Sequence, residues 1–319
     1  MARQSNALGL VLGQLQSAFD TAATVLDATD VLEIQGGYSI DQAVRTNEVD
    51  LVGGGWTQNQ SVLGPRDATV SMTMPLRTGG AADSVGQIAT LLKASMLDET
   101  EVSDVYTYVP TAKYSEWNAL TLWNYSGNLD SSGCMLEKFH NVIGSMKFSL
   151  DFGTGVALAT FDGKGVYSAA QEAGTQPDVT PSAIVVPSLV GATISFFSDT
   201  DYCLLSIEFD LGFDVSPTLQ PNATDGSGLG VTVPGKMKAK WTAKVYHDTT
   251  VNPITALLAR TLGTISIAWG TAPNKFTIST TKAMITEVKK SEDNGITTYD
   301  LSGILVDNNI SIAIDTTST

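Results

Sequence analysis

The sequence contains few of the residues that build most catalytic and metal sites. Among 319 residues there are two histidines, His140 and His247, and two cysteines, Cys134 and Cys203. Catalytic triads and zinc sites need several such side chains close together, and a secreted disulfide framework needs more cysteines. The sequence has no Walker loop, Cys-x-x-Cys or Gly-x-Ser-x-Gly motif. We therefore expect two reduced thiols, no enzymatic activity, no catalytic residues, no metal site and no cofactor.

Positive charge and long apolar runs are also scarce. The 18 basic residues stand against 33 acidic ones, for a net charge of −15. Without clustered bases, tight binding to a phosphate backbone or to an anionic membrane is disfavoured. An acidic surface would instead let DNA pass without sticking, although acidity can also serve solubility alone. There is no apolar run of transmembrane length, and the N-terminus makes a poor signal peptide, so we expect no membrane insertion and a cytoplasmic chain.

A short element occurs twice, about 166 residues apart. In each copy an alternating, strand-like segment, 66–76 and 235–247, leads through a turn into a short amphipathic helix. The helices are expected at 85–96 and 251–261. Their apolar residues follow the i, i+3, i+4 spacing of one helical face; the matching residues are Ile88, Leu91 and Leu92 with Ile254, Leu257 and Leu258. An internal duplication favours a subunit of a pseudo-symmetric assembly over a single catalytic pocket.

Around this repeat the chain is predicted to be mainly β, with short strands, turn chemistry and one short helix in each half. The clearest hairpin signal is 144–167, where Met146, Phe148 and Leu150 share one face, the turn is at 153–155, and Val156, Leu158 and Thr160 return. In 66–76, Met72 and Met74 alternate with polar residues and share an apolar face. Late strands are expected at 275–279 and 283–290, and the second of these begins a hairpin that turns at Asp293–Asn294–Gly295. Residues 168–182 are polar, contain two prolines and form the best linker. We therefore predict two tandem β-sandwich or barrel domains, 1–167 with an N-terminal arm and 183–319.

Three segments are harder to assign. The apolar periodicity of 5–27 predicts a helix, which Gly9 and Gly13 weaken, and the alternative is an arm that becomes ordered on assembly. Polar, Gly-rich residues 38–65 read as a long loop or a mobile hairpin, and 219–230 as a long loop in the equivalent place of the second half. Long loops are often functional, so these supply candidate assembly contacts, namely Trp56, Gln58, Asn59, Asn222 and Asp225.

A basic stripe is the other candidate contact. Lys236, Lys238 and Lys240 alternate with apolar residues, so a strand would place the three ammonium groups on one face. The simple interpretation is a solvated strand face. The functional one is a stripe that meets an acidic surface of a neighbouring subunit; DNA contact is a weaker option.

The order of these segments resembles the major tail tube protein of long, non-contractile-tailed bacteriophages, in the branch with two fused tube domains. The likeness extends over nearly the whole chain. It rests on an N-terminal stretch that leads into a first strand, on the strand, turn and Leu-Leu helix, and on closing hairpins with an aromatic-x-Gly pattern. The segments concerned are 10–34, 66–80, 87–95, 106–110, 122–153, 159–167, 207–215 and 293–303.

This resemblance implies a structural virion protein, assembled in the host cytoplasm, that polymerises into the hollow tail through which DNA is ejected. Three chains would form a ring with pseudo-sixfold symmetry, with six chains as the alternative. The rings would stack head to tail into a helical assembly, with contacts from 38–65, 216–232 and the N-terminal arm. Partners would be other copies, the tape measure, initiator or tip and terminator proteins, and DNA in transient, sequence-independent passage.

A different function class competes with this one. A carbohydrate-binding or adhesin-like β-sandwich could stack sugars on exposed tryptophans. The five tryptophans are spread over both halves, mostly in expected strands, so core packing is the favoured interpretation. They are Trp56, Trp117, Trp123, Trp241 and Trp269.

Overall fold

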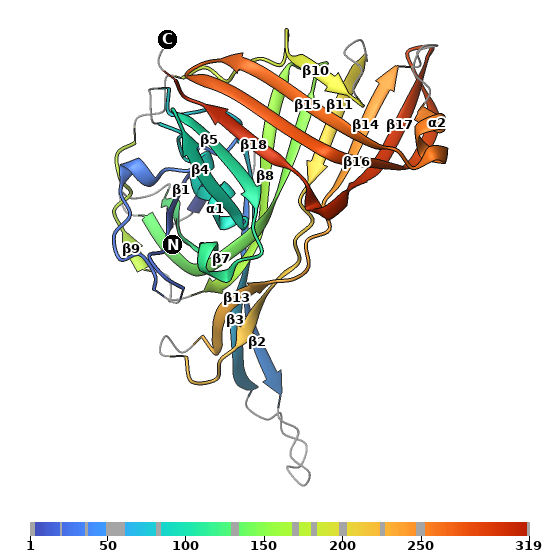
Figure 1. Cartoon of the computed structure of the whole chain (residues 1–319). Helices are drawn as coiled ribbons and strands as arrows, with labels where there is room; N and C mark the ends of the chain where they lie inside the picture. Colours follow the sequence, from blue (N-terminus) through green and yellow to red (C-terminus); the bar gives the residue numbers. More distant parts are fainter. Residues whose placement is uncertain are drawn as a thin grey trace.

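The protein is mainly β, as the sequence predicts (Figure 1). The computed structural model describes residues 4–19, 21–35, 38–48, 61–80, 84–128, 134–167, 172–179, 184–197, 203–223, 227–246 and 253–317. Most described strands belong to a single antiparallel sheet of 16 strands that runs through both halves of the chain. Only β12 and β13 form a separate pair.

The first half contributes eight strands and one α-helix. They are β1 (Gln4–Leu15), β2 (Ser39–Glu48), β3 (Ser61–Pro75), α1 (Ile88–Ala94), β4 (Leu97–Val102), β5 (Val105–Pro110), β6 (Leu120–Asn128), β7 (Cys134–Asp151) and β8 (Val156–Tyr167). Two 3₁₀ turns, η1 (Ala28–Asp30) and η2 (Tyr114–Glu116), lie between them.

The second half repeats the mixture. Its elements are β9 (Glu172–Gly174), β10 (Thr193–Phe196), β11 (Leu204–Asp210), β12 (Val215–Leu219), β13 (Leu229–Pro234), β14 (Lys240–Tyr246), α2 (Pro253–Ala259), β15 (Leu262–Thr271), β16 (Asn274–Asp293), β17 (Ile296–Leu305), η3 (Val306–Asn308) and β18 (Ser311–Asp315).

The helix predicted over 5–27 is wrong, because the N-terminus forms β1, which pairs antiparallel with β6. Val11 and Leu12 are both buried, in different core clusters, so the strand has apolar partners on both of its faces. A strand buried on two faces can mimic helical spacing over a few residues. Gly13 also suits the sheet, since a Cβ there would lie 2.8 Å from Leu32 Cδ1.

The internal repeat extends well beyond the strand–helix element. In the first half, neighbouring strands follow the order β2-β3-β8-β7, and in the second the order β11-β14-β17-β16. In each half the strand before the helix pairs with the returning strand of a long hairpin. Gly163 of β8 and Gly303 of β17 occupy matching places, each seven residues after the first residue of its strand, and at both a Cβ would clash with an aromatic ring. The two halves are therefore copies of one sheet module.

The two modules join edge to edge. Strand β7 of the first half pairs antiparallel with β11 of the second, from Lys147 opposite Asp210 to Asp151 opposite Ser206. Within the predicted linker, β9 is paired with β7, while 168–171 and 180–183 lie outside the described residues. Because the sheet is continuous across the halves, their division into two independent domains stays a prediction.

The two helices are packed differently, although the repeat predicts one face for both. In α1, Ile88, Leu91 and Leu92 are at most 1% exposed. In α2, Ile254 is 42% and Leu258 is 80% exposed. The β4–β5 hairpin follows α1 directly, whereas α2 runs almost straight into β15, so the second half lacks this cover.

The β4–β5 hairpin is fixed to α1 by polar contacts. Lys93 of α1 lies 2.7 Å from the carboxylate of Glu99 on β4. The hydroxyl of Tyr108 on β5 donates to the same carboxylate. Burial, assisted by this hydrogen bond, raises the pKa of Tyr108, which therefore remains a neutral donor.

The predicted hairpins are confirmed, with one change of face. Met146, Phe148 and Leu150 are fully buried on β7, as the alternation predicts. On the returning strand β8 the buried face carries Ala157, Ala159 and Phe161, one residue out of phase with the expected set. A one-residue shift exchanges the two faces of a strand.

Candidate assembly surfaces

Along the run β2-β3-β8-β7-β11-β14-β17-β16, which contains the two modules, two edges have no neighbour among the described residues; elsewhere in the sheet β1, β4, β9 and β10 also pair with one strand each. At one end, β2 pairs only with β3. At the other, β16 is flanked by β15 up to Met284, and beyond that residue it pairs only with β17. Unpaired N–H and C=O groups along such edges are templates for pairing with another chain. These two edges are the main candidate assembly surfaces, and we call them the β2 edge and the β16 edge.

The joint inside the chain shows how two such edges fit together. At the β7·β11 joint, Phe148 lies opposite Phe209, and both rings are fully buried. On the other face, Lys147 of β7 contacts the carboxylate of Glu208 on β11 across the joint at 2.9 Å, and Lys240 of the next strand, β14, contacts Asp210 of β11 at 3.2 Å. The joint therefore combines an apolar face with a face of alternating charges.

A third surface is made by two hairpins that extend together from one end of the molecule, β2–β3 and β12–β13 (Figure 1). Both predicted loops are thus hairpins over their described parts. They touch where the backbone N–H of Arg66 on β3 donates to the carbonyl of Ser227, in the turn between β12 and β13, at 3.0 Å. Asn222 is exposed on the second hairpin. Trp56, Gln58, Asn59 and Asp225 lie outside the described residues.

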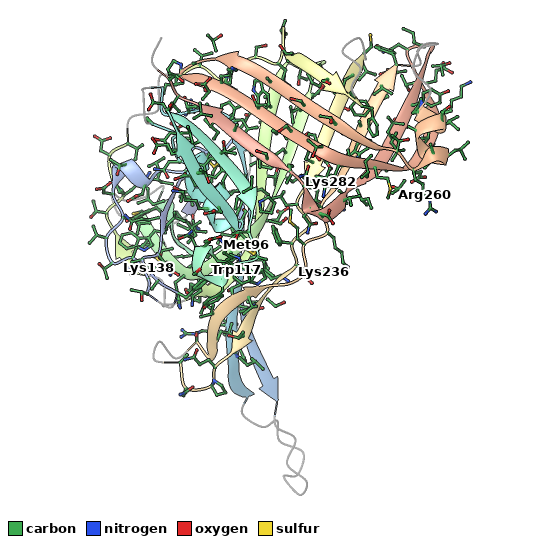
Figure 2. All side chains as sticks on the ribbon, viewed as in Figure 1. Met96, Trp117, Lys138, Lys236, Arg260 and Lys282 are labelled. Carbon is green, nitrogen blue, oxygen red and sulfur yellow. The ribbon has the colours of Figure 1, made fainter. Side chains whose placement is uncertain are left out.

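The basic stripe is only partly a strand, because β14 begins at Lys240. The alternation is nevertheless confirmed, since Lys236, Lys238 and Lys240 are exposed while Met237 and Ala239 are buried. Lys240 already pairs with Asp210 of its own chain, so it is not an unpaired contact. Lys236 lies in the segment that leads from β13 back to the sheet (Figure 2).

The tryptophans divide between the core and partly covered sites. Trp241 and Trp269 are at most 2% exposed, which confirms core packing for these two. Trp117 and Trp123 are half-buried, and Trp123 lies beneath the ammonium group of Lys138, 5.0 Å from its ring centre. Trp56 lies outside the described residues.

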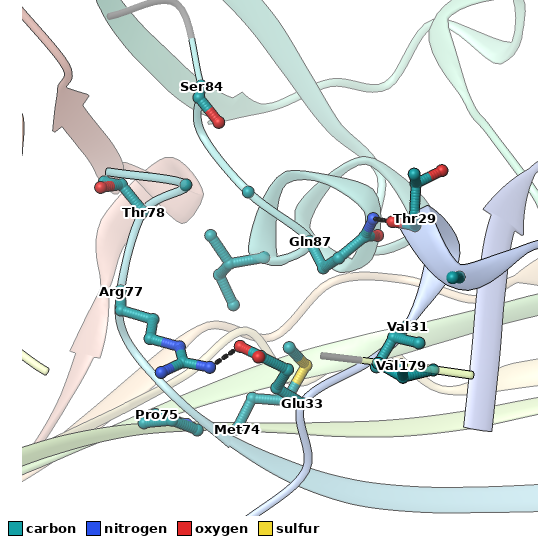
Figure 3. A pocket seen from close by; sticks show the side chains of 14 residues that line it. Thr29, Val31, Glu33, Met74, Pro75, Arg77, Thr78, Ser84, Gln87 and Val179 are labelled. Carbon is teal, nitrogen blue, oxygen red and sulfur yellow. Dashed lines mark hydrogen bonds and ion pairs between the residues drawn. The ribbon is translucent and has the colours of Figure 1, made fainter. Parts of the chain in front are cut away.

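One polar hollow of about 310 Å³ lies between η1, the segment after β3 and the start of α1 (Figure 3). Its charged side chains, Glu33 and Arg77, pair with each other, and Gln87 donates to the Thr29 carbonyl. Desolvation lowers the pKa of Arg77. Next to the hollow, Thr78 donates to the Pro273 carbonyl at 2.9 Å. The residues of this hollow therefore fit a structural role, in which they help to hold the first half of the chain against the second.

Comparisons with known proteins add no family. No protein-family model matches this chain, and no curated protein matches it. In the part of the chain that the structure describes, none of the helices has the length and apolar character needed to cross a bilayer. Across the same residues, His, Cys, Asp and Glu form no cluster of three or more that could hold a metal ion. Cys134 is buried and Cys203 is exposed, and both are free thiols.

The free edges are what sequence reasoning missed. Residues 39–48 were expected to be a loop or mobile hairpin because their composition is polar. A usable signal was present, since Ile40 alternates with Ser39 and Asp41 in a strand-like pattern. The β16 edge could not be predicted for a different reason. Two expected strands proved to be parts of one strand of 20 residues.

Proposed function

We propose that this protein is a structural subunit that polymerises into the hollow tail tube of a bacteriophage, through which DNA passes to the host. The observation that carries the proposal is the edge-to-edge joint of two equivalent modules by β7·β11. Each end of the eight-strand run formed by the two modules, β2 and the C-terminal part of β16, leaves the edge that a further module would need. A chain built in this way can add copies of itself without any new kind of contact.

Joining the β2 edge of one copy to the β16 edge of the next is a head-to-tail contact, because two different surfaces meet. If the rotation per copy closes, the result is a ring in which every β2 edge and every β16 edge is paired. Since each chain supplies two modules, three chains would give a ring with pseudo-sixfold symmetry, and six chains are the alternative.

Stacking of rings requires a second surface, and the paired hairpins β2–β3 and β12–β13 support that role. They extend from one end of the molecule (Figure 1), and a backbone hydrogen bond from Arg66 on β3 to Ser227 in the β12–β13 turn joins them. The net charge of −15 fits a channel that repels phosphates, so that DNA slides without sequence-specific contact. The tube would belong to the virion tail, would be assembled in the host cytoplasm, and would meet tape measure, tip and terminator proteins.

The competing function, carbohydrate binding by exposed tryptophans, gains no specific support. Two of the four described tryptophans, Trp241 and Trp269, are buried against other aromatic rings and offer no face to a sugar. We therefore advance assembly alone, and propose a non-enzymatic protein that uses no cofactor.

Negative-stain electron microscopy of the purified chain, at rising concentration, tests the proposal. We expect rings or tubes with a central channel. A chain that stays monomeric even with the tail initiator present contradicts it. Removal of Gly53–Gln60, in the segment that joins β2 to β3, should yield rings that do not stack, with a wild-type circular dichroism spectrum. Loss of the folded signal would show instead that this segment supports the fold.

A further inference from the structure

The internal joint specifies the register of the joint between copies, an inference that rests on the proposed function. Two positions align β7 with β16. Val142 of β7 lies opposite Leu120, the first residue of β6, and Met284 of β16 lies opposite Leu262, the first residue of β15. Each lies nine residues before an aspartate that ends the strand, Asp151 and Asp293. Lys147 of β7 therefore corresponds to Lys289 of β16.

The opposing strands are aligned in the same way, through their own neighbours. Phe161 of β8 is opposite Met72 of β3, and Leu301 of β17 is opposite Ala243 of β14. Phe161 and Leu301 hold equivalent places, two residues before the matching glycines at 163 and 303. On this alignment Thr69 of β3 corresponds to Lys240 of β14. Their partners then correspond as well, Asp41 of β2 with Asp210 of β11.

We infer that the β16 edge of one copy pairs antiparallel with the β2 edge of the next, with Lys289 opposite Asp41 and Ser291 opposite Ser39. This is the register of the internal joint, where Lys147 is opposite Asp210 and Ser149 is opposite Glu208. The partner is thus a second copy of this chain, bound through a defined set of strand pairs.

Charge on the two edges supports this register. Lys289 and Lys290 are exposed on the β16 edge and make no ion pair in the described part of the chain. Asp41 is exposed on the β2 edge and lines a hollow of about 400 Å³. The other charged residues of that hollow are Asp162, Asp214 and Lys164. An acidic hollow beside Asp41 is a suitable environment for an incoming ammonium group.

Polarity on the opposite face also distinguishes the two joints. Where the internal joint buries Phe148 and Phe209, the equivalent positions of the edges carry Lys290 and Ile40. A lysine in place of a buried phenylalanine lets the edge stay exposed in the free subunit, and charged edge residues suppress uncontrolled pairing. The joint between copies is therefore the more polar of the two.

Charge exchange tests the Lys289–Asp41 pair. Asp41→Lys and Lys289→Asp should each lower the assembled fraction by about tenfold or more, because like charges then face each other. The double variant, which restores opposite charges, should recover most of it. Asp178→Lys is the matched control, an exposed aspartate that lies on neither edge, and should assemble like wild type. Circular dichroism of each variant verifies that the subunit still folds.

Cysteine pairs test the register itself, in a Cys203→Ser background that removes the exposed native thiol. Ser39→Cys with Ser291→Cys places two thiols on directly opposite residues, whose Cα atoms lie about 4.5–5.5 Å apart in an antiparallel pair. Ser39→Cys with Asp293→Cys is the control, displaced by two residues to about 7–8 Å, beyond ready bridging, and it leaves Lys289 in place. Oxidised assemblies of the first variant should give covalent oligomers on a non-reducing gel, and the second should not.

The outcomes separate the register from the proposed function. If wild-type rings or tubes form but the in-register pair does not cross-link, or the displaced pair cross-links better, the register is wrong while tube assembly stands. A double charge variant no better than the single ones also overturns the pair. If the wild-type chain never assembles, the proposed function itself fails, and the joint between copies fails with it.

Discussion

Truncating the aromatic pair at the internal joint should destabilise the whole chain. Phe148 and Phe209 lie opposite each other on β7 and β11, and each ring is 0% exposed. A buried aromatic side chain removes at least about 150 Å² from water, which at about 25 cal/mol per Å² amounts to nearly 4 kcal/mol. Phe148→Ala and Phe209→Ala should therefore each lower the free energy of unfolding by about 3–5 kcal/mol.

Urea denaturation followed by far-ultraviolet circular dichroism and by tryptophan fluorescence measures this effect. The buried Trp241 and Trp269 report on the second half, so both probes should show one transition that shifts to lower urea in either variant. Leu219→Ala, at a residue that is 75% exposed, is the control and should change stability by less than about 0.5 kcal/mol. A loss below about 1 kcal/mol for both phenylalanines, or a transition confined to one probe, would refute a shared sheet and core.

Three further predictions concern single positions. Gly303→Ala should lower the free energy of unfolding, measured by urea denaturation, by about 1–3 kcal/mol, because the new Cβ would lie 2.3 Å from the Trp241 ring and 2.4 Å from the Met284 carbonyl oxygen. Gly153→Ala is the control and should cost much less, because the nearest atom to its new Cβ would be 3.2 Å away. Leu92→Ala in buried α1 should cost about 2–5 kcal/mol, while Leu258→Ala in exposed α2 should stay within about 0.5 kcal/mol; equal losses would contradict the different packing of the two helices. The hydrogen bond from Thr317, supported by Lys275, lowers the pKa of Asp315 below 3.8, so its stabilisation is present at neutral pH and is lost as pH falls through the lowered folded-state pKa. Wild type and Asp315→Asn should accordingly differ in thermal midpoint at pH 7 and converge in strong acid, and a gap that persists there would contradict this assignment.

Much of the fold could be predicted from local patterns. Alternation in β3 placed Met72 and Met74 on a buried face, and the Asp293–Asn294–Gly295 turn placed the last hairpin, where Asn294 and Gly295 have positive φ. These features depend on residues close in sequence, so the sequence carries them directly. The repeat between α1 and α2 was visible for the same reason.

Features that depend on distant neighbours were not predictable. The N-terminal strand required β6 as a partner, which no local pattern reveals. Exposure of Leu258 follows from the lack of an inserted hairpin like β4–β5 between α2 and β15, although its local sequence matches that of α1. Likewise the β2 and β16 edges became candidates only once the sheet order was known, because being an edge is a property of the sheet and not of the strand.

The central claim is that copies of this chain extend the sheet through the β16 and β2 edges. Cryo-electron microscopy of the assembled wild-type protein, at a resolution that separates strands, tests it most directly. The account predicts an unbroken sheet around the channel, in which the strand containing Lys289 lies beside the strand containing Asp41 of the next copy. An assembly whose copies meet elsewhere and leave both edges unpaired would contradict it.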